Sequence, residues 1–212
     1  IRSGPYSLDS LRGEARWDDE LLNGRASVHR KQEQWVAEFA GKNMMDSTVS
    51  WNAELRGENI DPAYWMEDST MHTKLDLRAK LAGSGLSLSP KPWRYSVVIS
   101  NVEVNEQTLD RAAAQGTINR ERFTTEGSIR IDQSAITFSG DITDFKTTPA
   151  YNLRANTNNF DLSEIHQTQR FPTDISGGIK LSGRGIEPGD MRLKSTVYAD
   201  SSIINGEILH NF

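Results

Sequence analysis

Apolar and polar residues alternate with a period of two along most of this chain. In "VSWNAELR", for example, Trp51, Ala53 and Leu55 alternate with polar residues. Such alternation is typical of β-strands that have one apolar face and one solvated face. The pattern therefore predicts an all-β fold with an antiparallel sheet and little helix.

The same alternation recurs in later segments, among them "KLDLRAKLA", "WRYSVVIS", "AITFSGDI", "AYNLRA" and "MRLKSTVYA". After Ile99 the phase shifts to Val102 and Val104, which is typical of a β-bulge. The residues that we expect to share one apolar face are Trp51, Ala53, Leu55, Leu75, Leu77, Leu81, Tyr95, Val97, Ile99, Ile129, Ile131, Ile136, Phe138, Tyr151, Leu153, Ile179, Leu181, Met191, Leu193 and Val197.

Turn signals separate these segments. Asn23-Gly24 in "LLNGRA" and Asn205-Gly206 in "IINGEI" each fit a type I′ hairpin turn between apolar pairs. The acidic "WDDE" at 17–20 is interpreted as a solvated hairpin end rather than a pair of catalytic carboxylates.

Two short segments depart from the strand pattern and predict helical turns near 62–68 and 161–168. Asp61 is a candidate N-cap, and Pro62 follows at the first helical position. Asp161 begins a D-x-x-E variant of the capping box.

These two helical segments are 100 residues apart, and so are "KLAGSG" at 80–85 and "KLSGRG" at 180–185. Placing residues 52–109 on 152–209 without gaps gives eleven identities. Background usage of about 6% per residue type would give roughly three or four. The chain thus contains an internal repeat, whose apolar strand faces must stack, fold over or be covered by another molecule.

The repeat divides the chain into a partial β-repeat at 1–48, a β-repeat at 49–148 and a second partial repeat at 149–212. The sequence begins at Ile1 and ends within an apparent element. We therefore expect one continuous array that is part of a longer protein.

The amino-acid composition excludes several classes of function and of binding site. The 212 residues include 24 basic and 29 acidic side chains and no cysteine. No basic stripe is present, so we expect no nucleic-acid partner, and disulfides and thiolate metal sites are excluded. No apolar run approaches the roughly 18 residues of a membrane-spanning helix.

The chain has no motif that indicates an enzyme. In "GRGIEPG", Pro188 occupies the third glycine position of a dinucleotide fingerprint, so a Gly-x-Gly turn that closes a strand is the better interpretation. The histidines have no metal-ligand spacing. We expect no catalytic residues, no metal and no cofactor. The scattered histidines are His29, His72, His166 and His210.

The stretches "YNLRANTNNFDLSEI" and "ISGGIKLSGRGIEPGDMRLKSTVYADSSIINGEI" resemble the repeats of the TamB family, the translocation and assembly module proteins of the AsmA-like superfamily. The resemblance covers about 149–208 well and 49–109 loosely, where Pro62 and Leu77 depart from the pattern. The residues that carry it are Tyr151, Phe160, Asp161, Leu162, Ile165, Gly177, Leu181, Gly183, Gly185, Ile204, Asn205 and Gly206.

The resemblance implies a sheet curved into an open trough, or β-taco, in a periplasmic part of an inner-membrane-anchored cell-envelope protein. It implies phospholipid as the cargo, carried between the inner and outer membranes, and a role in outer-membrane biogenesis and protein assembly. It also implies an outer-membrane Omp85-type barrel as partner, and membrane association through parts outside this sequence. It implies no catalytic residues.

An apolar trough is physically suited to acyl chains. Hiding a methylene from water gains about 0.8 kcal/mol, so a chain of 16 carbons gains on the order of 12 kcal/mol. The alternative is a structural or adhesive β-repeat, a solenoid or sandwich with a closed core and no lipid. A charge at Leu181 or Val197 should unfold a closed core and leave an open trough folded.

Overall fold

The fold is known from a computed structural model of the 212-residue chain. The structure describes residues 8–45, 49–65, 73–88, 91–104, 107–131, 134–145, 147–161, 173–185, 189–200, 202–204 and 207–209.

The chain forms two compact units, Ile1–Thr108 (unit 1) and Leu109–Phe212 (unit 2). Both consist of antiparallel strands, which confirms the predicted all-β fold class. The elements of unit 1 are β1 (Ser10–Asp18), β2 (Leu21–Arg30), β3 (Glu33–Lys42), β4 (Ser50–Ile60), α1 (Pro62–Trp65), β5 (Thr73–Ser84) and β6 (Trp93–Val104).

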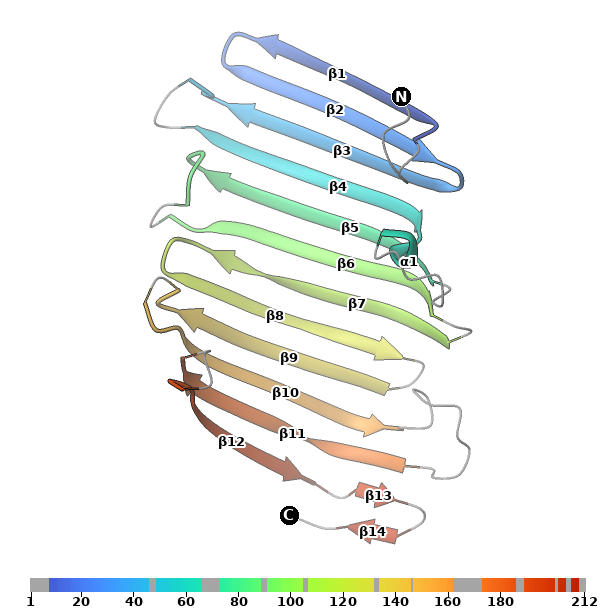
Figure 1. Ribbon diagram of the computed structural model, residues 1–212, viewed down its shortest axis with the longest axis vertical. Helices are drawn as coiled ribbons and strands as arrows, with labels where there is room; N and C mark the ends of the chain where they lie inside the picture. The colour runs from blue at the N-terminus through green and yellow to red at the C-terminus, as the bar shows by residue number, and fades with distance from the viewer. Residues whose placement is uncertain are drawn as a thin grey trace. The chain divides into compact units, whose positions relative to one another are not determined.

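In unit 1 each strand pairs with its neighbour in sequence, in the order β1-β2-β3-β4-β5-β6 (Figure 1). Ala26 lies opposite Ala37, Ala37 opposite Leu55, Leu55 opposite Ala79 and Ala79 opposite Val97. Because partners across a ladder point to the same side, this register places the apolar residues on one face. Among the described residues β1 and β6 do not pair with each other, so this sheet is open.

Unit 2 begins within β7 and follows the same plan (Figure 1). The strands β7 to β11 pair in sequence order, and β12 and β13 both pair with β11, along different parts of its length. The elements are β7 (Gln107–Ile118), β8 (Arg122–Ile131), β9 (Ser134–Thr143), β10 (Ala150–Phe160), β11 (Thr173–Arg184), β12 (Arg192–Ala199), β13 (Ser202–Ile204) and β14 (Glu207–Leu209).

Backbone details recur at the spacing of 100 residues that the sequence repeat predicts. Asn59 and Asn159 both have a φ of 53°, each beside a register shift at the end of a long strand. Gly85 and Gly185 both have a φ of 76°, a conformation that glycine adopts without strain. These glycines end β5 and β11, so "KLSGRG" closes a strand, as the sequence predicted.

The side chain of the candidate N-cap also recurs. The Asp61 carboxylate accepts hydrogen bonds from the Tyr64 amide at 3.4 Å and from the Thr73 hydroxyl at 3.0 Å. The Asp161 carboxylate accepts from the Thr173 amide and hydroxyl, both at 3.3 Å. Each aspartate thus fastens the end of one strand to the start of the next. The repeat boundaries at 49 and 149 remain a prediction. The two units are divided at residues 108 and 109 according to how the chain packs, and this division does not test where each repeat begins.

The predicted hairpin at Asn23-Gly24 is wrong. Both residues lie inside β2, whose 10 residues form a continuous ladder with β3. The chain turns earlier, at Asp19 and Glu20, where Asp19 adopts a φ of 49°. A turn at Asn23-Gly24 would break that ladder, and the acidic hairpin end that "WDDE" predicts supplies the reversal instead.

The other local predictions have mixed outcomes. Helix α1 confirms the first helical turn as far as Trp65, while 66–68 and 162–168 lie outside the described residues. The register of β5 against β6 shifts beside Asn101, which confirms the bulge after Ile99. Asn205 and Gly206 lie outside the described residues; β13 and β14, on either side of them, pair antiparallel.

Few apolar side chains are fully buried, and they lie at strand ends or in α1. Within the part of the chain that the structure describes, each unit is a single sheet layer with no second layer on its broad faces. Among the residues that the structure describes, the buried apolar ones are Val49, Ile60, Ala63 and Phe160.

Candidate functional site

The apolar face of unit 1 forms a groove of about 930 Å³ that extends over β1 to β6. Adjacent strands are spaced about 4.8 Å apart, so six strands span roughly 24 Å across the sheet. The apolar residues and glycines that line the groove are Gly13, Ala15, Gly24, Ala26, Ala37, Phe39, Ala53, Leu55, Ala79, Leu81, Tyr95 and Val97.

Small residues create the depth of the groove. A Cβ added to Gly13 would come no closer than 3.8 Å to a neighbouring atom, and one added to Gly24 no closer than 3.7 Å. Alanine at positions such as Ala26 and Ala37 adds only a methyl group. The space above β1 and β2 therefore stays empty, while larger side chains from β3 to β6 border it.

An aromatic cluster occupies one end of the apolar face. The rings of Trp51 and Trp93 meet edge to face, with centroids 4.9 Å apart. Trp51 Nε1 donates to the Gly85 carbonyl at 2.8 Å, and Trp93 Nε1 donates to the Ser84 carbonyl at 3.3 Å. Trp93 also lies over Gly83, where a Cβ would come within 2.3 Å of its ring. Trp51 therefore packs at the end of the face and is not among the residues that line the groove.

A ladder of ion pairs runs across the opposite face of unit 1. Arg56 bridges Glu38 at 3.5 Å and Glu54 at 2.7 Å. Arg78 and Lys80 also reach Glu54, at 2.6 and 3.8 Å. Glu38 lies directly opposite Glu54 in the register, so without the arginines this cross-strand pair would repel.

The ladder lowers the pKa of Glu54 to about 2. The largest cause is the hydrogen bond from Arg56. Desolvation is the next largest effect and raises the pKa, while the hydrogen bond from Arg78 and the charges of both arginines lower it further. The Glu54 side chain is 18% exposed, because the arginine side chains cover it. The same interaction raises the pKa of Arg56. One face of unit 1 is thus charged and internally neutralised, and the other is apolar.

A buried cluster joins α1 to the sheet. Arg30 and Glu33 form an ion pair at 3.0 Å, with side chains only 5% and 6% exposed. The Asp61 amide donates to the same Glu33 carboxylate at 3.1 Å, and the Arg30 guanidinium lies over the Tyr64 ring. This pairing offsets part of the cost of burying the two charges, although Arg30 Nε and Glu33 Oε2 have no hydrogen-bond partner among the described residues. We assign the cluster a structural role.

The structure places the predicted residues of unit 1 on one face, although only some line the groove. Ala53, Leu55, Leu81, Tyr95 and Val97 line it. The remaining members share their strand phase and lie outside the groove: Trp51, Leu75, Leu77 and Ile99.

The predicted residues of unit 2 also share a face, by the same register argument. Phe138 lies opposite Ala155, Leu153 opposite Leu181 and Ile179 opposite Val197. Val197 is 68% exposed, so the end of this face near β12 is open. Met191 precedes β12 rather than lying in a strand. The other members of this face are Ile129, Ile131, Ile136, Tyr151 and Leu193.

The predicted apolar face omitted seven of the twelve apolar residues and glycines that line the groove, Ala79 among them. Gly13, Ala15, Gly24 and Ala26 contribute little hydrophobic signal, and the false turn at Asn23-Gly24 concealed their alternation. The segment "WVAEFAG", which supplies Ala37 and Phe39, does alternate, so its period could have identified both residues.

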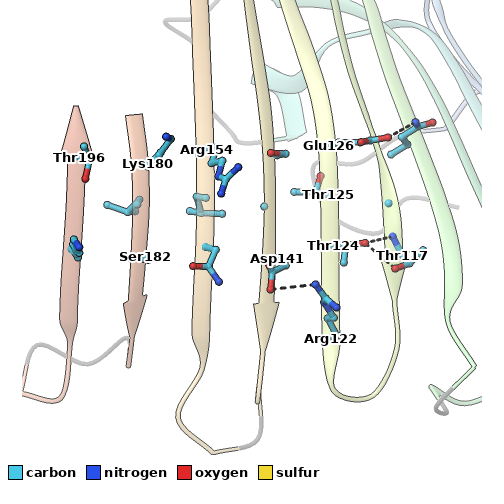
Figure 2. A pocket seen from close by; sticks show the side chains of 18 residues that line it. Thr117, Arg122, Thr124, Thr125, Glu126, Asp141, Arg154, Lys180, Ser182 and Thr196 are labelled. Carbon is cyan, nitrogen blue, oxygen red and sulfur yellow. Dashed lines mark hydrogen bonds and ion pairs between the residues drawn. The ribbon is translucent and has the colours of Figure 1, made fainter. Parts of the chain in front are cut away.

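A second concavity of about 850 Å³ lies over β7 to β12 in unit 2 (Figure 2). Apart from Thr125, the labelled side chains come from the polar strand phase, among them Thr124, Asp141, Arg154, Lys180 and Thr196. No sequence pattern had indicated it, since polar strand faces are normally solvated.

Comparison with protein-family models, with curated proteins and with solved structures finds no match to this chain. Within the described ranges, no helix is long and apolar enough to cross a membrane. Those ranges also contain no group of three or more histidine or acidic side chains placed to hold a metal ion.

Proposed function

We propose that this chain is a non-enzymatic, lipid-binding segment whose apolar groove in unit 1 holds phospholipid acyl chains. The observation that carries the proposal is the groove itself, which has a volume of about 930 Å³ and lies on a single-layer sheet. Most of its lining is alanine, glycine, leucine, valine and two aromatic residues, and five charged residues of the other strand phase complete it: Glu14, Arg25, Glu38, Glu54 and Lys80. A volume near the upper end of the usual 300–1,000 Å³ for ligand pockets suits a long apolar ligand.

The two faces of unit 1 favour this reading over a closed core. A closed core would cover the apolar face with a second layer, and the described elements of unit 1 supply none. The opposite face has its charges paired in the ion-pair ladder, so it is suited to water. An amphiphile would complete this arrangement by covering the apolar face with its own methylenes.

The uniform lining also suits movement. Because most of the lining is alkyl or aromatic, displacement of an acyl chain along the groove exchanges one apolar contact for another. Retention can then be strong while the barrier to sliding stays low. This part of the proposal rests on the groove lining, in which twelve apolar residues and glycines outnumber five charged residues.

The resemblance of 149–208 to TamB repeats motivates the finer proposal. We propose a TamB-like trough segment in the periplasm, within an inner-membrane-anchored protein that carries phospholipid between the membranes. An outer-membrane Omp85-type barrel would be its partner. The shared strand pattern and the recurrence of Asp61 and Asp161 contacts 100 residues apart support a repeat array of this kind.

Native mass spectrometry of the chain, purified after expression with a cell envelope present, tests the proposal. We expect adducts with phospholipid masses that organic extraction identifies as diacyl lipids. A lipid-free protein that also fails to bind added phosphatidylglycerol or phosphatidylethanolamine would contradict the proposal.

A matched pair of variants locates the lipid. Leu81→Glu places a charge in the groove, and Ala82→Glu places the same charge one residue on, at an exposed position of the other strand phase. We expect Leu81→Glu to lose most of the bound lipid and Ala82→Glu to keep it, because an unpaired charge among acyl chains is costly. Equal lipid loss in both variants would contradict binding in this groove.

A further inference from the structure

The polar concavity of unit 2 is rich in cations at one end. Four basic side chains and two carboxylates line it. Arg122 pairs with Asp141 at 3.6 Å, and Glu126 accepts a hydrogen bond from Gln115 at 2.8 Å (Figure 2). Both carboxylates therefore lie toward β7 to β9, while the three remaining cations lie on β10, β11 and β12. These cations are Arg154, Lys180 and Lys194.

The cations at this end face one another. Arg154 lies directly opposite Lys180 in the register, and Arg184 lies opposite Arg192 on the same strand phase. Like charges directly opposite each other destabilise a sheet. Within the described residues, no carboxylate forms an ion pair with these four side chains, and the Lys180 ammonium lies 5.4 Å from the centroid of the Tyr198 ring.

Unit 1 shows how the same problem is solved internally. There the opposed Glu38 and Glu54 are bridged by Arg56, so its polar face is neutralised by its own side chains. The cation cluster on β10 to β12 has no such internal bridge, although the whole chain has an excess of acidic residues, with a net charge of −5. This face therefore has a local excess of positive charge, which an anionic ligand would neutralise.

Neutral hydrogen-bonding groups fill the rest of the lining. Hydroxyls and amides come from every strand of the concavity, and each can both donate and accept. Such groups match the hydroxyls of a sugar ring, and arginine and lysine match a carboxylate or phosphate on it. The neutral lining groups that the argument uses are Thr117, Ser139, Asn152, Ser182 and Thr196.

We propose that this concavity binds an acidic oligosaccharide, with its anionic groups on Arg154, Lys180 and Lys194 and its hydroxyls on the threonine, serine and asparagine side chains. The site lies on the broad face of the sheet, where backbone groups are already paired in the ladder, so it offers an acidic peptide no strand edge to extend. A flat anionic membrane also fits this surface poorly. The surface is hollow, and the described side chains that line it from this face include no apolar ones that could insert into the membrane.

Isothermal titration calorimetry of the 212-residue chain with tetragalacturonate tests the proposal. We expect saturable binding that weakens as salt rises. The fully methyl-esterified tetramer, which keeps the sugar and loses the charge, should bind at least tenfold more weakly. An octaglutamate peptide and glycerophosphoglycerol, which is the phosphatidylglycerol headgroup without acyl chains, serve as anions without sugar and should bind more weakly than tetragalacturonate.

Two variants place the ligand. Arg154→Gln with Lys194→Gln removes two cations of the concavity, and Arg130→Gln removes a cation of the same face and unit outside it. We expect about a tenfold loss of affinity for the double variant and no more than about a twofold change for Arg130→Gln. In the absence of ligand, the melting temperature of the double variant should be no lower than that of the parent. The substitutions remove repulsion between like charges, such as that between Arg154 and Lys180, and break no ion pair among the described residues.

Three results would overturn the proposal. They are the absence of tetragalacturonate binding, equal binding of octaglutamate or glycerophosphoglycerol, and equal effects of the double variant and Arg130→Gln. Since the site lies in unit 2 and on the polar face, none of these results bears on lipid binding in unit 1.

Discussion

At the scale of single residues, the charged face of unit 1 is a chain of cooperating pairs rather than a set of isolated contacts. Glu54 accepts from two arginines and lies within 3.8 Å of Lys80. Each exposed ion pair alone contributes little. Together they keep Glu54 ionised and hold the opposed carboxylates on β3 and β4 in register.

The depressed pKa of Glu54 gives unit 1 a pH dependence. Since the pKa falls from 4.5 to about 2 on folding, the stabilisation is fully present above pH 4.5 and is lost as pH falls toward 2. After allowance for solvent screening we expect about 1 kcal/mol. Chemical unfolding between pH 6 and 2 should show a steeper loss for the parent than for Glu54→Gln. Identical pH profiles would contradict this assignment.

The aspartates that follow β4 and β10 each connect the end of one strand to the start of the next by hydrogen bonds. Asp61→Ala removes the cap of α1 and the partner of Thr73, and we expect a loss of about 1–2 kcal/mol in the free energy of unfolding. Asp161→Ala should cost a similar amount, since Asp161 holds Thr173 in the same way. Denaturant titration of both variants checks this. An unchanged free energy of unfolding in either variant would show that the hydrogen bonds of that aspartate do not stabilise the fold.

At the scale of elements, the fold depends on which side chains may lie above a strand. Glycines let large side chains fold over a neighbour: Trp93 lies over Gly83, and the Tyr151 ring lies over Gly183. Where no large side chain lies over the glycine, as at Gly13, the space remains open and becomes part of the groove. The same residue type thus closes one part of the face and opens another.

This contrast predicts opposite results for two glycine substitutions. Gly83→Ala drives a methyl group into the ring of Trp93, which two other contacts hold in place, and we expect a loss of about 1–3 kcal/mol. Gly13→Ala adds the same methyl group at ordinary contact distance and should change stability by less than about 0.5 kcal/mol. Thermal unfolding of both variants is the measurement, and equal melting temperatures would contradict the account of the aromatic cluster.

Period-two alternation sufficed to predict the strands and their apolar face, because a strand leaves one side chain in two on each side. It placed Ala53, Leu55 and Val97 correctly on one face with no knowledge of pairing. It failed at Asn23-Gly24, because a turn dipeptide can also sit inside a strand when the ladder continues on both sides. The polar concavity depends on how side chains from β7 to β12 are arranged in space, and the pattern of polar residues along the chain does not encode that arrangement.

At the scale of the whole molecule, two concave surfaces of opposite character are present, each within one unit, and we propose a ligand for each. The apolar groove of unit 1 suits acyl chains, and the polar concavity of unit 2 suits an anionic, hydroxyl-rich ligand. Neither needs catalytic residues.

The central claim is that acyl chains lie on the apolar face of unit 1 and not merely on exposed apolar residues. Strand β3 offers the sharpest test, since Ala37 and Phe39 line the groove while Val36 and Ala40 are nonpolar residues of the opposite phase. A photocrosslinking amino acid at each of these four positions, with radiolabelled phospholipid, gives the measurement. The account predicts lipid adducts at 37 and 39 and none above background at 36 and 40. Equal labelling of both phases, or labelling at 36 and 40 alone, would contradict it.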